Sequence, residues 1–268
     1  MSRTVAIALV LLIALGGVGL YLQREHPQPT AMLLPTPGVS SPSSRGLPIT
    51  AEPQAIQRDE ALAGGGNSAS RIAVPGMVDG SDEMTRAAAY RLAPALAKWL
   101  TPEQQLRKWV ALVDAVAEAK LSEKILPLKY PMSSFSTTQG LSSARNGEAI
   151  YASPTNFART NLLIETLTAI PPQTLADYYH AWSKLLERAN AELGRRGSFD
   201  SRLHIALQKV IAVEPLPDNA ALARPQFYYT YADPALEKSS DVAKLLWRMG
   251  PANQHQLQSY LSELLPLL

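Results

Sequence analysis

An uncharged apolar run near the N-terminus constrains this chain more than any other feature. Residues 5–22 carry no charged side chain and consist almost entirely of Ala, Val, Ile, Leu and Gly. As an α-helix the run would span roughly 27 Å, close to the bilayer hydrocarbon core of about 30 Å. Arg3 precedes it, whereas Arg24 behind it is offset by Glu25. We therefore expect a transmembrane helix over 5–22 in the inner membrane, a cytoplasmic tail over 1–4, and a periplasmic C-terminal part.

A cleaved signal peptide is the alternative interpretation of this run. Gly17 and Gly19 are small enough for a weak cleavage site. Leu20, Tyr21 and Leu22 nevertheless continue the apolar run past these glycines, and the ring of Tyr21 would lie at the depth that aromatic side chains prefer. These three residues favour a retained anchor.

The segment that follows, residues 23–80, has no hydrophobic periodicity. It combines serines and a glycine triplet with many prolines, which are Pro27, Pro29, Pro35, Pro37, Pro42, Pro48, Pro53 and Pro75. A segment of this composition cannot bury enough apolar surface to fold. We expect a disordered linker, whose end-to-end distance as a flexible coil would be roughly 40 Å.

Composition limits what residues 81–268 can be. They are enough for one hydrophobic core, so a single soluble domain is expected. The net charge of the chain is only +2. The sequence contains no cysteine, and this excludes disulfides, thiolate metal sites and a lipid-modified cysteine. Positive and negative residues are intermixed along the domain, so no nucleic-acid partner is expected.

Apolar spacing predicts a mainly α-helical domain. Thr101-Pro-Glu-Gln104 has the pattern of a capping box with Pro at the first helical position, and an amphipathic helix is expected from there to about Lys120. A second helix is predicted from Pro172 to about Leu193, with Gly194 as its left-handed C-terminal cap.

A small two-stranded β excursion is expected between these helices. Pro127 and Pro131 interrupt the helical pattern, and Asn146-Gly147 is a frequent hairpin turn between short segments that could form strands. Further along, Phe227, Tyr228, Tyr229 and Tyr231 suggest a short extended segment.

The search for catalytic and metal-binding motifs gives no candidate. The sequence contains no His-Glu-x-x-His, Gly-x-Ser-x-Gly or Ser-x-x-Lys pattern, and no glycine-rich nucleotide-binding loop. We therefore predict no catalytic residue, no metal ligand and no cofactor.

Five segments of the domain are recognisable beyond their spacing: Asn156-Phe-Ala-Arg159, Ala191-Glu-Leu-Gly194, Phe199 with Arg202-Leu203, Tyr231-Ala-Asp-Pro-Ala-Leu-Glu237 and Lys244-Leu-Leu-Trp-Arg-Met-Gly-Pro-Ala-Asn253. With these segments the domain resembles a bacterial family of membrane-anchored proteins, domain of unknown function 3014. The resemblance covers roughly residues 82–268. It implies an N-terminal anchor, a variable linker and a C-terminal domain, and implies no activity, substrate or cofactor.

Arg159 is the residue of these segments that no cap or helix end requires. We hypothesise that it pairs with Asp233 or Glu237, either as a buried structural ion pair or within a polar binding site. Arg248, placed at the end of a predicted helix before Gly250, is added as a candidate binding residue.

Tyr229 and Tyr231 complete the candidate binding residues. Alternate rings on an extended segment could stack on a sugar or a peptide, although such rings are more often half buried in a core.

These expectations lead to three functional hypotheses. The first is a membrane-tethered, non-catalytic module that binds an envelope protein or a cell-wall component in the periplasm. The second is an envelope hydrolase that uses carboxylates near Asp233 and Glu237 as acid and base. The third is a scaffold subunit of a membrane complex.

Overall fold

The computed structural model describes residues 72–122, 125–142, 147–218, 220–225 and 228–268. The predicted cytoplasmic tail, transmembrane helix and most of the predicted linker lie outside these residues. None of the helices within the described part is both long enough and apolar enough to span a bilayer.

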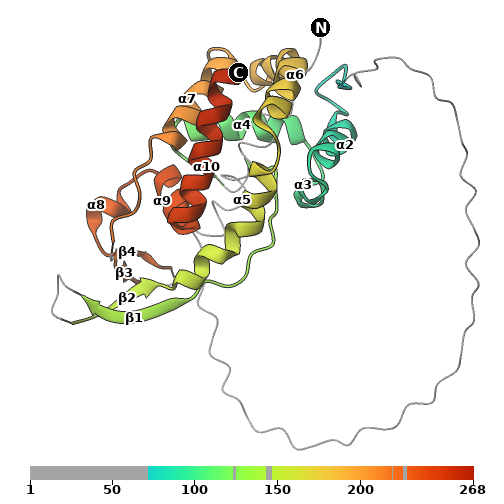
Figure 1. Ribbon diagram of the computed structural model, residues 1–268. Helices are drawn as coiled ribbons and strands as arrows, with labels where there is room; N and C mark the ends of the chain where they lie inside the picture. The colour runs from blue at the N-terminus through green and yellow to red at the C-terminus, as the bar shows by residue number, and fades with distance from the viewer. Residues whose placement is uncertain (1–71, 123–124, 143–146, 219, 226–227) are drawn as a thin grey trace, which may run out of the picture. The chain divides into compact units, whose positions relative to one another are not determined.

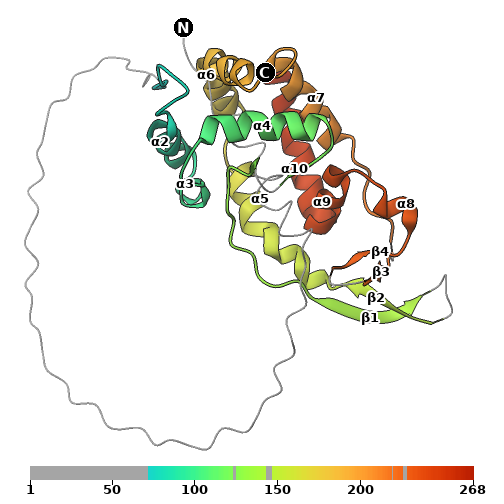
Figure 2. The ribbon, with the colours of Figure 1, turned by 180° about the vertical axis from the view of Figure 1, so that it is seen from behind.

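The described part is mainly helical, as predicted, and carries a small antiparallel sheet (Figures 1 and 2). The α-helices are α2 (Asp82–Leu92), α3 (Pro94–Trp99), α4 (Gln105–Ala117), α5 (Asn161–Thr168), α6 (Pro172–Glu192), α7 (Phe199–Ile211), α8 (Pro234–Glu237), α9 (Asp241–Met249) and α10 (Pro251–Leu264). Two 3-10 helices are η2 (Pro154–Thr160), directly before α5, and η3 (Leu265–Leu267), directly after α10.

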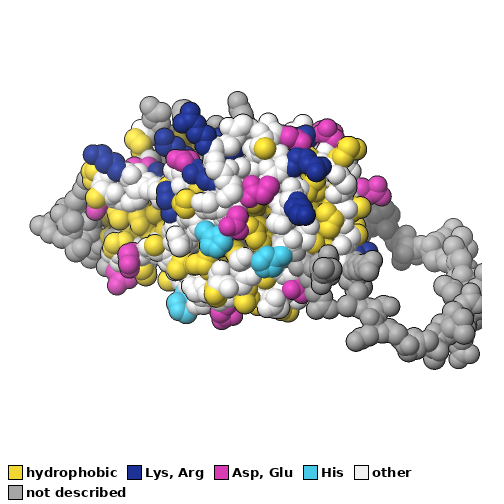
Figure 3. All heavy atoms as spheres, turned by 90° about the horizontal axis from the view of Figure 1, so that it is seen from above, with side chains coloured by type: hydrophobic (Ala, Val, Ile, Leu, Met, Phe, Trp, Pro, Cys, Tyr) yellow, Lys and Arg dark blue, Asp and Glu magenta, His cyan; other side chains and the backbone are white. Residues whose placement is uncertain are grey.

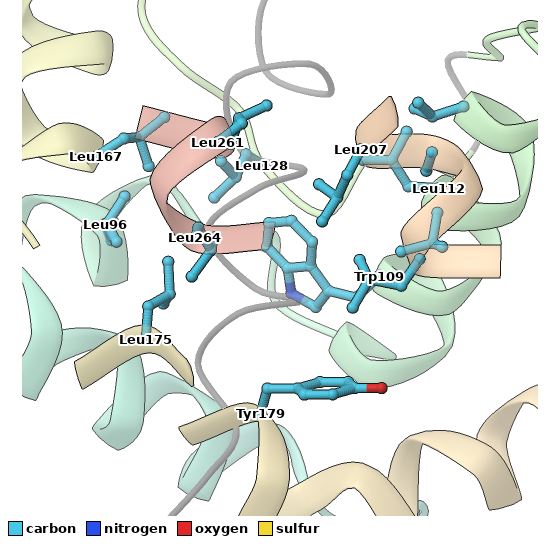
Figure 4. Close-up of a cluster of buried hydrophobic side chains, with 14 of the residues drawn as sticks. Leu96, Trp109, Leu112, Leu128, Leu167, Leu175, Tyr179, Leu207, Leu261 and Leu264 are labelled. Atoms are coloured by element: carbon cyan, nitrogen blue, oxygen red, sulfur yellow. The ribbon is translucent and has the colours of Figure 1, made fainter. Parts of the chain in front are cut away.

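The main hydrophobic core forms between α4, α6, α7 and α10. Helix α4 packs against α6 and α7, and α10 packs against α5, α6 and α7. Trp109 of α4 is fully buried (0% exposed) among side chains that include Tyr179, Leu207 and Leu264 (Figure 4). Its indole Nε1 donates a hydrogen bond to Oε1 of Gln105 at 3.1 Å, so the ring is buried without an unsatisfied donor.

Residues 72–80 pack on the helical domain. Nε1 of Trp182 donates to the carbonyl of Ala73 at 3.0 Å, and Nη1 of Arg188 donates to the carbonyl of Gly76 at 3.1 Å. Val78 is buried in the main core. The packed part of the chain therefore begins before residue 81, the domain start expected from composition.

The predicted start of α4 is wrong by several residues. Thr101 does not cap a helix that begins at Pro102; α4 begins at Gln105, after Gln104 with φ +57°. The carboxylate of Asp82, on α2, accepts hydrogen bonds from the backbone N–H of Gln104 (2.8 Å) and of Gln105 (2.7 Å). The cap therefore comes from a distant helix, which local sequence spacing cannot reveal.

The prediction of a helix from Pro172 to about Leu193 is confirmed. Helix α6 begins at Pro172 and ends at Glu192, and Gly194 follows with φ +66°, the left-handed conformation expected of a C-terminal cap.

The predicted hairpin is also confirmed, but the sheet is larger than expected. Strands β1 (Thr137–Ser142) and β2 (Gly147–Ala152) pair antiparallel. Two short strands, β3 (Leu222–Ala223) and β4 (Thr230–Tyr231), extend the sheet in the order β1-β2-β3-β4. The sheet lies beside η2 and α9, at one end of the helical core (Figures 1 and 2).

Candidate ligand-binding site

A second apolar cluster joins the sheet to α9. Trp247 of α9 is 8% exposed and meets Tyr231 of β4 edge to face, with ring centroids 5.6 Å apart. Leu216 and Leu222 pack against the same cluster. Nε1 of Trp247 donates to the carbonyl of Glu214 at 2.9 Å. This packing fixes both β4 and the connection after α7 against α9.

The turn between α9 and α10 packs directly on η2. Gly250 has φ +86° and ψ 158°, a conformation that is essentially restricted to glycine. A Cβ atom at this position would lie 2.4 Å from Cγ of Phe157. Nδ2 of Asn253 lies 3.0 Å from the carbonyl of Phe157 and 2.9 Å from Oδ1 of Asn161. The Phe157 ring can therefore pack against the turn between α9 and α10 only because Gly250 has no side chain.

These contacts frame an open pocket, which we call the hairpin pocket. Its volume is about 670 Å³, within the range of small-molecule and peptide sites. Its walls come from β1, β2, η2, the connection after α7, and the junction of α9 with α10. The lining residues are Thr138, Gln139, Gly140, Tyr151, Ala152, Pro154, Phe157, Pro215, Leu216, Pro217, Asp218, Ala220, Trp247, Pro251 and Gln254.

The ring of Tyr151 lies close over the backbone of β1. A Cβ atom on Gly140 would meet Cε2 of Tyr151 at 3.0 Å and Cδ2 at 3.2 Å. Gly140 thus leaves room for this aromatic ring on the sheet. Tyr151 pairs with Thr138 in the register of the two strands. The half-buried ring forms one wall of the hairpin pocket.

The charge of the hairpin pocket is low. Among its described lining residues Asp218 is the acidic one, and Lys and Arg are absent. On the molecular face seen in Figure 3, Lys and Arg side chains are interspersed with Asp and Glu rather than gathered in a patch. The lining therefore favours an uncharged or cationic ligand over an anionic one.

A smaller cavity of about 50 Å³ adjoins the hairpin pocket and shares Ala152, Phe157, Leu216, Ala220 and Trp247 with it. Its other lining residues are Phe135, Asn156, Leu222, Tyr229, Tyr231 and Arg248. Three of the six predicted binding residues, Tyr229, Tyr231 and Arg248, are thus brought together beside the pocket.

Arg159, whose pairing with Asp233 or Glu237 stays a prediction, is buried beside the aromatic ring of Phe135. Arg159 is 7% exposed, and its guanidinium lies 5.7 Å from the ring centre of Phe135. Oδ1 of Asp233 accepts from the N–H of Ala235 at 2.7 Å and so caps α8. Asp233 is extended and directly precedes Pro234, the first residue of α8. Its side chain is therefore in the N-cap position of that helix.

Glu237 also has local partners. Its Oε2 accepts from the backbone N–H of Tyr231 at 2.8 Å, and Oε1 lies 3.4 Å from Nζ of Lys244. The carboxylate thereby fastens α8 to β4 and α9. Neither Glu237 nor Asp233 lines the hairpin pocket or the adjoining cavity.

Sequence patterns missed the residues that form most of the pocket. Tyr151 gave no signal beyond ordinary spacing, and Phe157 and Trp247 lie in segments that carried the family resemblance but were not predicted as binding residues. The pocket depends on contacts between distant segments, which sequence patterns do not show. Gly250-Pro251 did predict the end of one helix and the start of the next. It did not predict that this junction lies close against η2. Among the described residues no group of three or more His, Asp or Glu side chains could hold a metal ion.

The fold and the site define a class of protein: a mainly helical domain with a small antiparallel sheet and an aromatic pocket where the two meet. The chain belongs to the family described as "Protein of unknown function (DUF3014)", whose model matches residues 105–265. Two segments that carried the resemblance, 156–159 and 244–253, meet at the wall of the pocket. No curated protein and no solved structure matches the chain.

The contact between Gly250 and Phe157 gives a stability prediction. Gly250→Ala should lower the free energy of unfolding by about 2–6 kcal/mol, because backbone strain of about 1–3 kcal/mol adds to overpacking of about 1–3 kcal/mol. Gly194→Ala is the matched control, since Gly194 also has a positive φ but open space around it, and should cost only about 1–2 kcal/mol. Urea unfolding measures both variants. Equal losses would contradict the packing role assigned to Gly250.

Proposed function

We propose that this chain is a membrane-tethered, non-catalytic module that binds an envelope protein or a cell-wall component on the periplasmic side. In this proposal residues 5–22 form the anchor, residues 23 to about 71 form the tether, and the hairpin pocket is the binding site. The ligand would meet the domain at the end of the sheet, between the hairpin and η2.

The observation that carries the proposal is the lining of the hairpin pocket. Tyr151, Phe157 and Trp247 line the pocket, together with four prolines and the polar residues Thr138 and Gln139. Concave surfaces of this kind, mostly apolar with a few polar groups, are typical of ligand recognition. Fixed rings also lose little conformational entropy when a ligand binds.

The hydrolase hypothesis gains less support from this geometry. It needs Asp233 and Glu237 in a cleft, yet the first caps α8 and the second binds a backbone N–H and Lys244. Neither lies among the residues around the pocket. The scaffold hypothesis shares the anchor and the tether with the proposal but gives the pocket no role.

Site-specific photo-crosslinking in intact cells tests the binding role of the pocket. A photoreactive amino acid at Asp218, on the exposed rim of the pocket, should form a discrete crosslinked product. The control is the same amino acid at Tyr90 on α2, which is 60% exposed and does not line the hairpin pocket. If no crosslinked product forms from position 218, or if the same product forms from positions 218 and 90, the result would count against the proposal.

An alkaline phosphatase fusion after residue 80 tests the anchor and its orientation. The enzyme should be active and remain in the membrane fraction, because its disulfides form only in an oxidising compartment outside the cytoplasm. Activity confined to the soluble periplasmic fraction would indicate a cleaved signal peptide. An inactive fusion would place the domain in the cytoplasm.

A further inference from the structure

Strand β1 is the outer strand of the sheet. The order β1-β2-β3-β4 leaves one side of β1 without a neighbouring strand among the described residues. In Figure 1 this side of the hairpin faces away from the helices. An open edge of this kind presents a row of backbone donors and acceptors.

The register of the hairpin identifies which backbone groups face the open edge. The N–H of Ser153 donates to the carbonyl of Ser136 at 3.0 Å, directly before the first pair of the ladder, Thr137 with Ala152. Hydrogen-bonded and non-bonded pairs alternate along an antiparallel ladder. Thr138 and Gly140 therefore direct their backbone groups to β2, whereas Thr137 and Gln139 direct theirs to the open edge.

The edge also lacks the features that usually prevent strand addition. Strand β1 has the sequence Thr-Thr-Gln-Gly-Leu-Ser, without a charged residue or a proline. Its register with β2 runs through six consecutive pairs without a bulge. Proteins commonly protect exposed edges with lysine, proline or bulges, so an unprotected edge beside a pocket is available for a ligand.

The edge and the hairpin pocket adjoin, because Thr138, Gln139 and Gly140 of β1 line the pocket. A strand added along β1 would thus run beside a hollow of about 670 Å³ walled by Tyr151 and Phe157. Alternate side chains of an added strand point to the same face of the sheet. Such side chains could enter the pocket while the backbone pairs with β1.

From this juxtaposition we infer that the hairpin pocket recognises an extended peptide, which adds to the open edge of β1 as a further strand and places apolar side chains in the pocket. The inference rests on the proposed function and names the ligand class. The peptide is uncharged or basic, because Asp218 is the charged residue of the described lining. Backbone pairing supplies affinity and the pocket supplies side-chain specificity.

The test uses the full-length chain in detergent micelles and a phage-displayed library of random dodecapeptides. Selected peptides should be uncharged or basic, with apolar residues at alternate positions. Their binding is then measured by calorimetry against the wild type, Gln139→Pro and Gln139→Ala. Gln139→Pro removes the outward N–H and leaves the ladder to β2 intact, whereas Gln139→Ala removes the same side chain and keeps the N–H.

Gln139→Pro should weaken binding at least about tenfold through the lost hydrogen bond and the clash of its ring with the added strand. Gln139→Ala lacks the same side chain, so the difference of about tenfold is expected between the two variants, and any contribution of the Gln139 carboxamide to binding cancels in that comparison. Amide hydrogen exchange should slow over residues 137–142 when a peptide is bound, and unfolding midpoints should confirm that both variants are folded.

The alternative outcomes separate this inference from the proposed function. Equal binding by both variants, or binding of N-acetylglucosamine oligosaccharides in place of any peptide, would overturn strand addition and leave a pocket that binds ligand in another way. No binding of peptides or of these oligosaccharides would overturn the inference, and the in-cell crosslink at Asp218 would then decide the proposed function separately.

Discussion

The pocket depends on a close approach between two segments that are far apart in sequence. Gly250 allows the turn from α9 to α10 to lie against the ring of Phe157 in η2. The side chain of Asn253 then binds backbone and side-chain oxygens of η2 and α5. Because Trp247 precedes this turn by one helical turn, the same junction also sets where the sheet can pack on α9. Any bulkier residue at Gly250 would have to move η2, and with it one wall of the pocket.

The helices could be predicted where their signals are local. The apolar spacing and the flanking Pro172 and Gly194 define α6 within the chain segment itself. The hairpin was predictable for the same reason, since a local turn signal separates two short segments that pair with each other, although Gly147 of that signal is already the first residue of β2 and pairs with Ser142. Asp233 before Pro234 also acts as the expected cap of α8.

The missed features all depend on contacts between distant segments. The cap of α4 comes from Asp82 on another helix, so the spacing around Thr101 was misleading. Strands β3 and β4 have two residues each and depend on packing against Trp247 and on pairing, β3 with β2 and β4 with β3. No local pattern encodes these choices.

The proposed binding site depends on the junction between α9 and α10. The helical core around Trp109 holds α9 and α10 in place, and their junction supports the sheet whose hairpin forms the pocket. Hydroxyl-radical footprinting of the chain in intact cells and after purification tests most directly whether this pocket is a binding site. The predicted result is lower oxidation of Tyr151 in cells than in the purified chain, with equal oxidation of Tyr90. Equal oxidation of Tyr151 in both states would contradict the assignment of the pocket as the site of ligand binding.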